Sequence, residues 1–283
     1  MKKMLSFVLA MAMCLTLTAC SGNGNGPASS SANSGSSSSS GSSAGSTPDS
    51  DLTYVQNKGT LVVGITEFEP MDYQDASGSW IGFDADLARA FAESLGVEVQ
   101  FQVIDWDNKT FELEGKTIDA VWNGMTLTQE VKAAMECSNP YFNNAQVVIV
   151  PTDMADQYQT VDSVKDLSFA VEIGSAGKEQ ADLNNLTYTE VADQATALLE
   201  VSSGTADAAI IDYLMAMAMT GEGTSYGDLT FAASLNSEEY GVGFRKGSDL
   251  AAALNNFFAE KYADGTMQQV ADTYGIGDML VEQ

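Results

Sequence analysis

The sequence predicts an α/β protein built of two similar lobes, each around a mostly parallel β-sheet. Apolar runs of strand length alternate with amphipathic segments of helix length, which is the pattern of β-α-β units. The pattern starts again after Tyr141, so the chain holds two such series. In each series a glycine and then an Asp-Ala pair introduce an apolar strand, at Asp119-Ala120 and at Asp207-Ala208.

The first series begins with a buried strand over Thr60–Ile65. Residues 84–95 suit a helix, because apolar side chains recur at i, i+4 and i+8 and Gly96 follows the last of them. Alternation over residues 97–103 and an apolar run over residues 118–122 predict two more strands. Two β-α-β passes of this kind favour a parallel sheet.

The second series contains further expected strands and helices. The strands are residues 146–150, 169–173, 206–212, 229–235 and 239–245, of which the last crosses back to the first lobe. The helices are residues 176–183, residues 193–201, a Met-rich helix from Tyr213, and a last helix that Ser248 caps and Gly265 ends.

The segment Asp119–Asn144 is the centre of the predicted site. Its strand breaks at Gly124, and Thr126 and Thr128 place hydroxyl groups beside a helix start. Open α/β sheets bind ligands at strand ends of this kind. Counted from the two Asp-Ala pairs, Gly124 and Asp212 fall at matching strand ends, so both are expected to line a cleft between the lobes.

Residues 1–19 have the order of a signal peptide, with Lys2 and Lys3, an apolar run, and small residues before Cys20. This order resembles the lipobox of bacterial lipoproteins, in which the cysteine is acylated after cleavage; palmitate is the acyl group we expect. Residues 20–50 would be the lipidated cysteine and a disordered tether rich in Ser and Gly. An ordinary signal peptide, or an uncleaved anchor that holds a cysteine, is the alternative.

Charge argues against two classes of partner. The chain has 12 basic and 39 acidic residues, and without Lys2 and Lys3 its net charge is −29. We expect no binding of nucleic acid, and none of anionic lipid by charge. Cys137 is the only cysteine beyond Cys20, so no internal disulfide is expected in the exported part.

The sequence contains no histidine, which excludes Ser-His-Asp and Cys-His catalysis and histidine metal sites. Ser175 and Lys178 match a Ser-x-x-Lys motif, but they lie on a glycine-rich turn and no Lys-Thr-Gly partner exists. We therefore expect neither an enzyme nor a metal ion or other cofactor.

A binding site for a small zwitterion remains, which needs aromatic platforms, oxygens for an ammonium group and donors for a carboxylate. The candidates are Phe68 and Trp106 as platforms, Asp212 for the ammonium, and Thr126 and Ser175 as hydroxyl donors. Two alternatives stay open. Trp106 belongs to the core instead, or Asp212 caps the helix that begins at Tyr213.

Seven motifs in this order carry a resemblance to a known family. They are Phe83–Leu87, Trp122–Thr128, Ser138–Tyr141, Gly174–Ser175, Asp207–Asp212, Tyr240–Lys246 and Ala263–Thr266. The chain resembles, over about residues 58–278, the polar-amino-acid solute-binding proteins of ABC importers, the family-3 type. The resemblance implies a type II periplasmic-binding-protein-like fold. Its first lobe would be residues 51–140 with 241–283, its second lobe residues 146–235, and its hinges residues 141–145 and 236–240.

The resemblance also implies roles for single residues. The two aromatic platforms would sandwich the ligand. The Gly124 carbonyl and Asp212 would take its α-ammonium group, and Thr126 and Ser175 would meet its α-carboxylate. Each of these residue types suits its implied role.

One position departs from the family pattern. Val131 stands where the family has an arginine that binds the ligand carboxylate in a bidentate manner. Glu172, at a loop position that can touch the ligand side chain, and Glu67 add acids to the site. We therefore expect a ligand of net positive charge, either a basic amino acid or an amine without an α-carboxylate. Alternatively, Lys109 replaces the arginine and an ordinary amino acid binds.

Together these expectations describe a lipid-anchored binding protein on the outer face of a cell membrane or in a periplasm. It would close two lobes on a small amino compound and present it to an ABC permease. We expect a monomer that contacts the membrane only through its lipid. A ligand-sensing protein of a receptor, and a lyase like cyclohexadienyl dehydratase on the same fold, are the alternatives.

Overall fold

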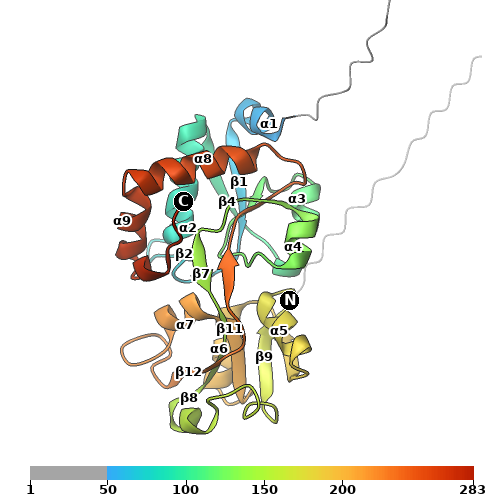
Figure 1. The fold of residues 1–283 in the computed structure, drawn as a ribbon, viewed down its shortest axis with the longest axis vertical. Coiled ribbons are helices and arrows are strands. Elements are labelled where there is room, and N and C mark those ends of the chain that lie inside the picture. The colour runs from blue at the N-terminus through green and yellow to red at the C-terminus, as the bar shows by residue number, and fades with distance from the viewer. Residues whose placement is uncertain (1–49) are drawn as a thin grey trace, which may run out of the picture. The chain divides into compact units, whose positions relative to one another are not determined.

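The structure is a computed structural model that describes residues 50–283 (Figure 1). The predictions for residues 1–49, including the signal peptide, the lipidated Cys20 and most of the tether, lie outside the described residues. Within residues 50–283, none of the helices combines the length and the apolar character that crossing a bilayer requires.

The first lobe is built around a five-stranded sheet in the order β4-β1-β5-β14-β6. Its strands are β1 (Thr60–Ile65), β4 (Glu98–Val103), β5 (Ala120–Val121), β6 (Glu136–Cys137) and β14 (Gly243–Phe244). Strand β1 runs parallel to β4 and β5, whereas β14 is antiparallel to its neighbours β5 and β6. A two-stranded antiparallel ribbon of β2 (Tyr73–Gln74) and β3 (Trp80–Ile81) precedes the helix Phe83–Leu95 and contacts it through β3.

The helices of this lobe come from both ends of the chain. They are α1 (Asp51–Lys58), α2 (Phe83–Leu95), α3 (Lys109–Glu114), α4 (Gln129–Ala134), α8 (Leu250–Ala263) and α9 (Thr266–Thr273), with short 3-10 turns at Trp106–Asn108 and Gly277–Met279. Figure 1 shows α8 and α9 crossing the outer side of the lobe next to α2. As predicted, Gly96 ends α2 in the left-handed conformation, with φ +74°.

The second lobe has a five-stranded sheet in the order β10-β9-β11-β8-β12. Its strands are β8 (Gln146–Pro151), β9 (Ser168–Glu172), β10 (Thr187–Val191), β11 (Ala208–Asp212) and β12 (Leu229–Ser234). Its helices are α5 (Ala176–Leu183), α6 (Gln194–Ser202) and α7 (Tyr213–Met219), with a 3-10 segment at Thr152–Gln157. Strands β9, β10 and β11 are parallel, and β8 is antiparallel to β11 and β12.

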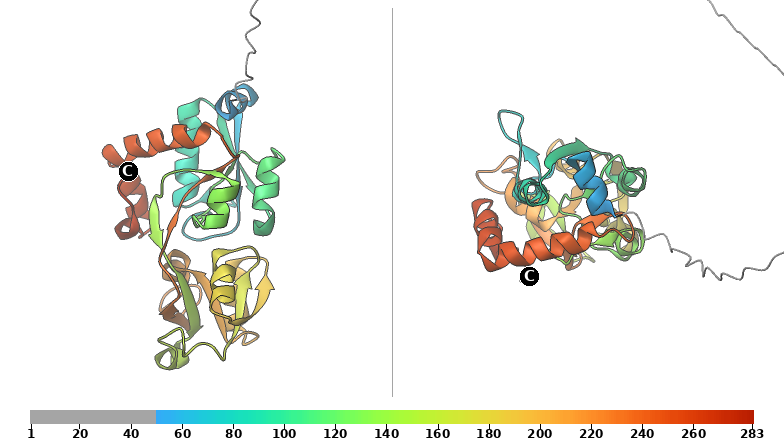
Figure 2. Two further views of the ribbon diagram at one scale, coloured as in Figure 1. Left: turned by 45° about the vertical axis from the view of Figure 1, so that its right-hand side comes forward. Right: turned by 90° about the horizontal axis from the view of Figure 1, so that it is seen from above.

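Two chain segments pass between the lobes, as both figures show (Figures 1 and 2). They are β7 (Phe142–Asn144) and β13 (Glu238–Tyr240), which pair with each other in an antiparallel ladder. The predicted architecture of two α/β lobes with a two-segment connection is therefore present.

Three expected elements differ in detail. The strand expected at residues 239–245 is split into β13 and β14, because Gly241 and Val242 separate the connection from the first sheet. The position before α8 is taken by Asp249, while Ser248 accepts a bond from the Leu250 N–H at 3.3 Å. Gly265 does not end the helical region; at φ +82° it turns the chain into α9, which the sequence pattern did not predict.

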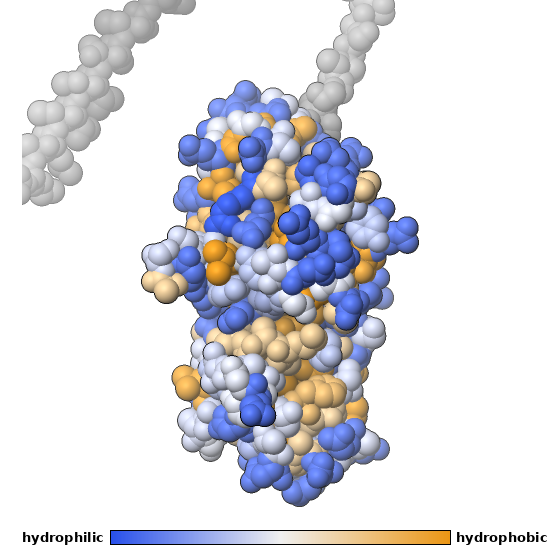
Figure 3. All heavy atoms as spheres, turned by 90° about the vertical axis from the view of Figure 1, so that its left-hand side faces the viewer, coloured by the Kyte–Doolittle hydropathy of each residue, from blue (hydrophilic) through white to orange (hydrophobic). Residues whose placement is uncertain are grey.

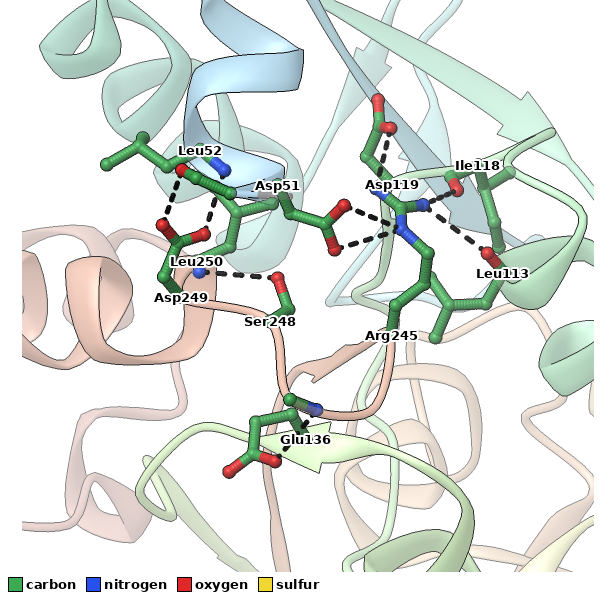
Figure 4. Close-up of polar contacts among 12 residues, drawn as sticks. Asp51, Leu52, Leu113, Ile118, Asp119, Glu136, Arg245, Ser248, Asp249 and Leu250 are labelled. Atoms are coloured by element: carbon green, nitrogen blue, oxygen red, sulfur yellow. Dashed lines mark hydrogen bonds and ion pairs between the residues drawn. The ribbon is translucent and has the colours of Figure 1, made fainter. Parts of the chain in front are cut away.

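A buried ion cluster ties the first helix to the sheet of the first lobe (Figure 4). Arg245 donates from Nε to the Asp51 carboxylate at 2.9 Å and from Nη2 to Asp119 Oδ1 at 3.3 Å. Lys58 pairs with the other oxygen of Asp119, which also accepts the Val62 N–H at 2.9 Å. The cluster therefore fixes the start of β5, whose far end leads to Gly124.

The repeat that the sequence suggested has a structural counterpart in the second lobe. Asp207 precedes β11 as Asp119 precedes β5, and its Oδ2 accepts the Ser168 N–H of the neighbouring β9 at 2.9 Å. Each aspartate thus holds a parallel strand pair in register. Strand β11 ends at Asp212, and β5 ends at Val121, three residues before Gly124.

The two lobes differ on their surface. In Figure 3 the upper, first lobe is mostly hydrophilic, and apolar colour gathers at the junction and over the second lobe. Among the described residues, four of the large exposed hydrophobic side chains belong to the second lobe: Leu183, Leu199, Met217 and Phe231.

Candidate functional site

A cavity of about 540 Å³ lies between the two lobes and is lined by residues of both. The loops that follow β1, β4 and β5 line it from the first lobe, and the loops that follow β9 and β11 line it from the second lobe. All eight residues that the sequence singled out for ligand contact line it: Glu67, Phe68, Trp106, Gly124, Thr126, Glu172, Ser175 and Asp212.

The two aromatic side chains are anchored in the first lobe. Phe68 is 3% exposed, and its ring meets Tyr240 edge-on, with 6.3 Å between centroids. Trp106 is 8% exposed and also packs in an apolar cluster with Val131 and Met135. The core alternative for Trp106 and its role in lining the cavity are therefore both correct descriptions of one residue.

Gly124 is the one position of the loop after β5 where a side chain cannot fit. Its φ is +55°, and a Cβ there would lie 2.4 Å from Cε1 of Phe68. Its N–H donates to Oδ2 of the buried Asp84 at 2.7 Å, and Tyr141 donates to the same oxygen at 2.8 Å. Burial raises the pKa of Asp84 to about 7. The hydrogen bond from Gly124 to Asp84 thus fixes the turn that presents the Gly124 carbonyl to the cavity.

Asp212 ends β11 and is 4% exposed. Its Oδ1 accepts bonds from Asn144 Nδ2 at 2.6 Å, Gln146 Nε2 at 2.9 Å and the Tyr240 hydroxyl at 2.7 Å. Gln194 donates to Oδ2. Asp212 occupies the N-cap position of α7, as the alternative stated, but its side chain forms no hydrogen bond to the helix. Burial, and next the charge of Glu238, raise the pKa of Asp212 to about 7.

Glu172 ends β9 beside Asp212 and is 3% exposed. Gln194 Nε2 is its only donor among the described residues, at 3.4 Å from Oε2, and Oε1 has no partner. Burial, and next the charge of Asp212, raise the pKa of Glu172 to about 8. A buried carboxyl with an unpaired oxygen gains most from a ligand that donates to it.

The two hydroxyl candidates are placed differently. Thr126 donates its hydroxyl hydrogen to Glu238 Oε1 at 2.7 Å, so it offers no free donor in this conformation. Ser175 caps α5 by accepting the Lys178 N–H at 3.1 Å, which leaves its own hydroxyl hydrogen available.

Glu67 is exposed at the rim and accepts the Gln74 N–H at 3.0 Å. Val131, in α4, lines the cavity with an apolar side chain that is 8% exposed. Lys109 enters the cavity: its Nζ lies 4.7 Å from the centroid of the Trp106 ring and donates to the Gly174 carbonyl of the other lobe at 2.9 Å. Burial lowers the pKa of Lys109.

Several polar residues around Asp212 escaped the sequence interpretation. They are Asn144, Gln146, Gln194, Glu238 and Tyr240. Tyr240 belongs to one of the quoted motifs. The three amides and the glutamate lie on four different elements, β7, β8, α6 and β13, so no sequence spacing marks them. Only their position opposite the end of β11 reveals them.

Two α/β lobes around a polar cavity, joined by two strands, define a two-lobed binding protein of the type II periplasmic-binding-protein fold. The family model of the bacterial extracellular solute-binding proteins, family 3, matches residues 61–277, and the chain belongs to this family.

Relatives and solved structures agree with this assignment. The chain is 29% identical over 227 residues to an L-cystine-binding protein of Escherichia coli, covering 79% of this chain and 85% of that protein. It is 27% identical to an arginine-binding extracellular protein of Bacillus subtilis, over 78% of this chain and 88% of that one. An ABC transporter substrate-binding protein of Streptococcus pneumoniae with bound histidine has a TM-score of 0.76 at 27% identity, over 83% of this chain and all of that one.

Proposed function

We propose that this solute-binding protein takes up a small amino compound of net positive charge and delivers it to an ABC importer. Asp212 and Glu172 would receive cationic groups, and Phe68 and Trp106 would enclose the carbon skeleton. One observation supports the proposal above the others: both carboxylates are buried in the cavity wall, and neither forms an ion pair with a lysine or arginine among residues 50–283.

The charge of the whole cavity wall supports the same ligand class. Its acidic side chains are Glu67, Asp107, Glu130, Glu172, Glu179, Asp182, Glu190 and Asp212, whereas its basic ones are Lys109 and Lys178. Lys178 is occupied by Asp182 at 3.0 Å and Glu190 at 3.7 Å. A site of such composition attracts cations and disfavours anions.

Lys109 supports a second arrangement, in which the ligand keeps an α-carboxylate. An ammonium group has three donors. Two of them go to the carbonyls of Trp106, at 3.2 Å, and Gly174, at 2.9 Å. The third could meet a carboxylate where the family arginine is replaced by Val131. A basic amino acid satisfies both arrangements, since it brings two cations and one carboxylate.

Ligand-driven closure is the proposed mechanism. The carboxylates belong to the second lobe and the aromatic platforms to the first, so one ligand touches both only when the lobes are together. The connecting pair β7 and β13 would be the hinge. Gly174 already approaches the first lobe so closely that a Cβ there would lie 2.9 Å from Asp107 Cα.

Titration calorimetry on the purified protein tests the ligand class. The panel is L-arginine, L-lysine, a linear diamine, L-glutamine and L-cystine, at pH 7.5 and low salt. We expect the basic amino acids to bind at least tenfold more tightly than glutamine. Tight binding of glutamine without binding of basic amino acids or diamine would contradict the proposal.

Further parts of the proposal concern the setting of the site. Acylation at Cys20 would hold the protein, as a monomer, at the outer side of a membrane near its permease. Catalysis is not proposed. NMR spectra of a bound ligand over hours should show no new product, and a product would instead favour a lyase that uses Glu172 as its acid.

A further inference from the structure

Asp212 does not stand alone at the cavity wall. Asn144 Nδ2 lies 2.6 Å from Asp212 Oδ1 and 2.7 Å from Glu238 Oε1. Gln146 Nε2 lies 2.9 Å and 2.8 Å from the same two oxygens. Two amide groups therefore hold the two carboxylates side by side, and each amide divides its N–H donors between them.

Every group that donates to this carboxylate pair is neutral. Beyond the two shared amides, Asp212 accepts hydrogen bonds from the Tyr240 hydroxyl and the Gln194 amide. Glu238 accepts them from the Thr126 hydroxyl and the Asn236 amide. Two carboxylates that are bridged by neutral donors repel each other across a short distance. In the absence of a cation, the pair is relieved by a proton on Asp212, which agrees with the raised pKa of that carboxyl.

We propose that Glu238 is a positioning residue of the cavity that acts through Asp212, so that the two carboxylates form a single doubly charged counter-ion for the cationic group of the ligand. This inference rests on the proposed function, because it requires a cation at Asp212. Glu238 does not line the cavity itself. It lies on β13, one of the two connecting strands, and accepts from Thr126 of the first lobe and Gln146 of the second.

The inference predicts a coupling between ligand binding and protons. A cation beside Asp212 favours the ionised carboxylate, so binding displaces the proton and tightens as the pH rises through about 7. Other charged groups face the same region: Glu172 at the end of β9, Asp193 before α6, and Lys109 on α3, which opposes them. The hydroxyl of Tyr240 donates to Asp212. Because Glu172 also titrates within this range, only the difference between a Glu238 variant and the wild type reports the contribution of Glu238.

The test compares the wild type with Glu238→Gln, and with Glu239→Gln as the matched control, since Glu239 is the exposed neighbour on the same strand. L-Arginine is titrated from pH 5.5 to 8.5. We expect E238Q to bind about tenfold less tightly at pH 8, because one charge near the cation is gone. The midpoint of its pH profile should fall by about one unit, because a cause of the raised Asp212 pKa is removed. E239Q should match the wild type.

Calorimetry of the wild type in two buffers of different ionisation enthalpy gives a second measurement that needs no variant. Binding at pH 6.5 should release protons into the buffer. Unchanged affinity and an unchanged pH midpoint in E238Q would overturn the inference while the proposed function stands. If E238Q does not fold, the wild-type calorimetry decides, and binding of L-arginine without proton release would overturn the inference in the same way. A wild type that binds none of the cationic compounds would overturn both.

Discussion

Two buried aspartates, one in each lobe, are surrounded in opposite ways. Asp119 of the first lobe faces Arg245 (Figure 4). It also pairs with Lys58, so its negative charge is neutralised inside the protein. The Asp119 carboxylate accepts three hydrogen bonds. The Asp212 carboxylate of the second lobe accepts four, but only from amides and a hydroxyl. The carboxylate oxygens of both residues are hydrogen-bonded. The donors to Asp119 include two cations that balance its negative charge, whereas the donors to Asp212 are all neutral.

The difference separates a structural carboxylate from a binding one. A buried ion pair costs desolvation, and it persists when each charge has its partner within the fold. A buried carboxylate without a cation is destabilising until something else supplies the charge. At Asp119 the supplier is Arg245. At Asp212, next to a cavity of about 540 Å³, we propose that it is the ligand.

Substitution at Arg245 should break the balanced cluster and give the largest effect. Arg245→Met removes the donors to Asp51, Asp119 and the Ile118 carbonyl, and leaves buried charge behind. We expect a loss of about 3–5 kcal/mol in the free energy of unfolding, measured by urea titration.

Lys165→Met serves as its control, because Lys165 pairs with Asp162 on the surface, where an ion pair adds little. Adding Asp119→Asn to R245M should restore part of the loss, since it removes one of the uncompensated charges. Equal stability of R245M and the wild type would show that the cluster does not matter energetically.

The corresponding change at Asp212 should have the opposite sign for stability. The pKa of Asp212 is raised to about 7 in the folded protein, above its ordinary value of 3.8. The folded state therefore holds a proton that the unfolded state releases, and stability falls as the pH rises from about 4 through about 7. Asp212→Asn imitates the protonated form. At pH 8 its free energy of unfolding should therefore be about 2–4 kcal/mol larger than that of the ligand-free wild type.

The same variant should bind L-arginine at least a hundredfold less tightly, since a cation loses its carboxylate in a buried site. Melting curves of both proteins at pH 4.5 and pH 8 give the stability difference, which should shrink to about 1 kcal/mol or less at the lower pH. A variant that is less stable at pH 8, or one that keeps its affinity, would place Asp212 with the structural residues.

Much of the fold followed from the sequence, and the reasons are local. The strand at Thr60–Ile65 and the helices at Ala176–Leu183 and Gln194–Ser202 have apolar spacing of one period and clear ends. The helix α9 was missed because Gly265 suggests an end, and only its packing on α8 and α2 shows that the chain turns there and continues as a helix. Strand β5 has two residues rather than five, since β1 pairs with it at two positions and β14 at one.

The site was predictable in part for a different reason. Residues at strand ends, such as Gly124 and Asp212, are found by counting along the chain, because parallel strands bring their ends to one edge. The antiparallel pairing of β8 with β11 inside the second lobe places Gln146 opposite Asp212, and the ladder of β7 with β13 positions Glu238. No local pattern encodes either pairing. The sequence could therefore indicate a carboxylate at the cavity but not the absence of a cation beside it.

Substitution of Lys109, a cation that lines the cavity, should have the smallest effect of the three changes. Its positive charge acts on Glu172, yet its ammonium group forms no ion pair among the described residues and bonds two carbonyls instead. Lys109→Met removes a like charge that a cationic ligand would meet, and it removes the bond to Gly174 across the cavity. These two effects oppose each other, so the affinity for the diamine should change by less than about fivefold.

A ligand whose carboxylate uses the third N–H of Lys109 should instead bind about tenfold less tightly to K109M. Parallel titrations of a diamine and of L-arginine into K109M and the wild type separate the two cases. If K109M weakens both ligands by a hundredfold, the lysine is the cavity's principal holding group, and the contrast between a neutralised Asp119 and an unbalanced Asp212 loses its functional meaning.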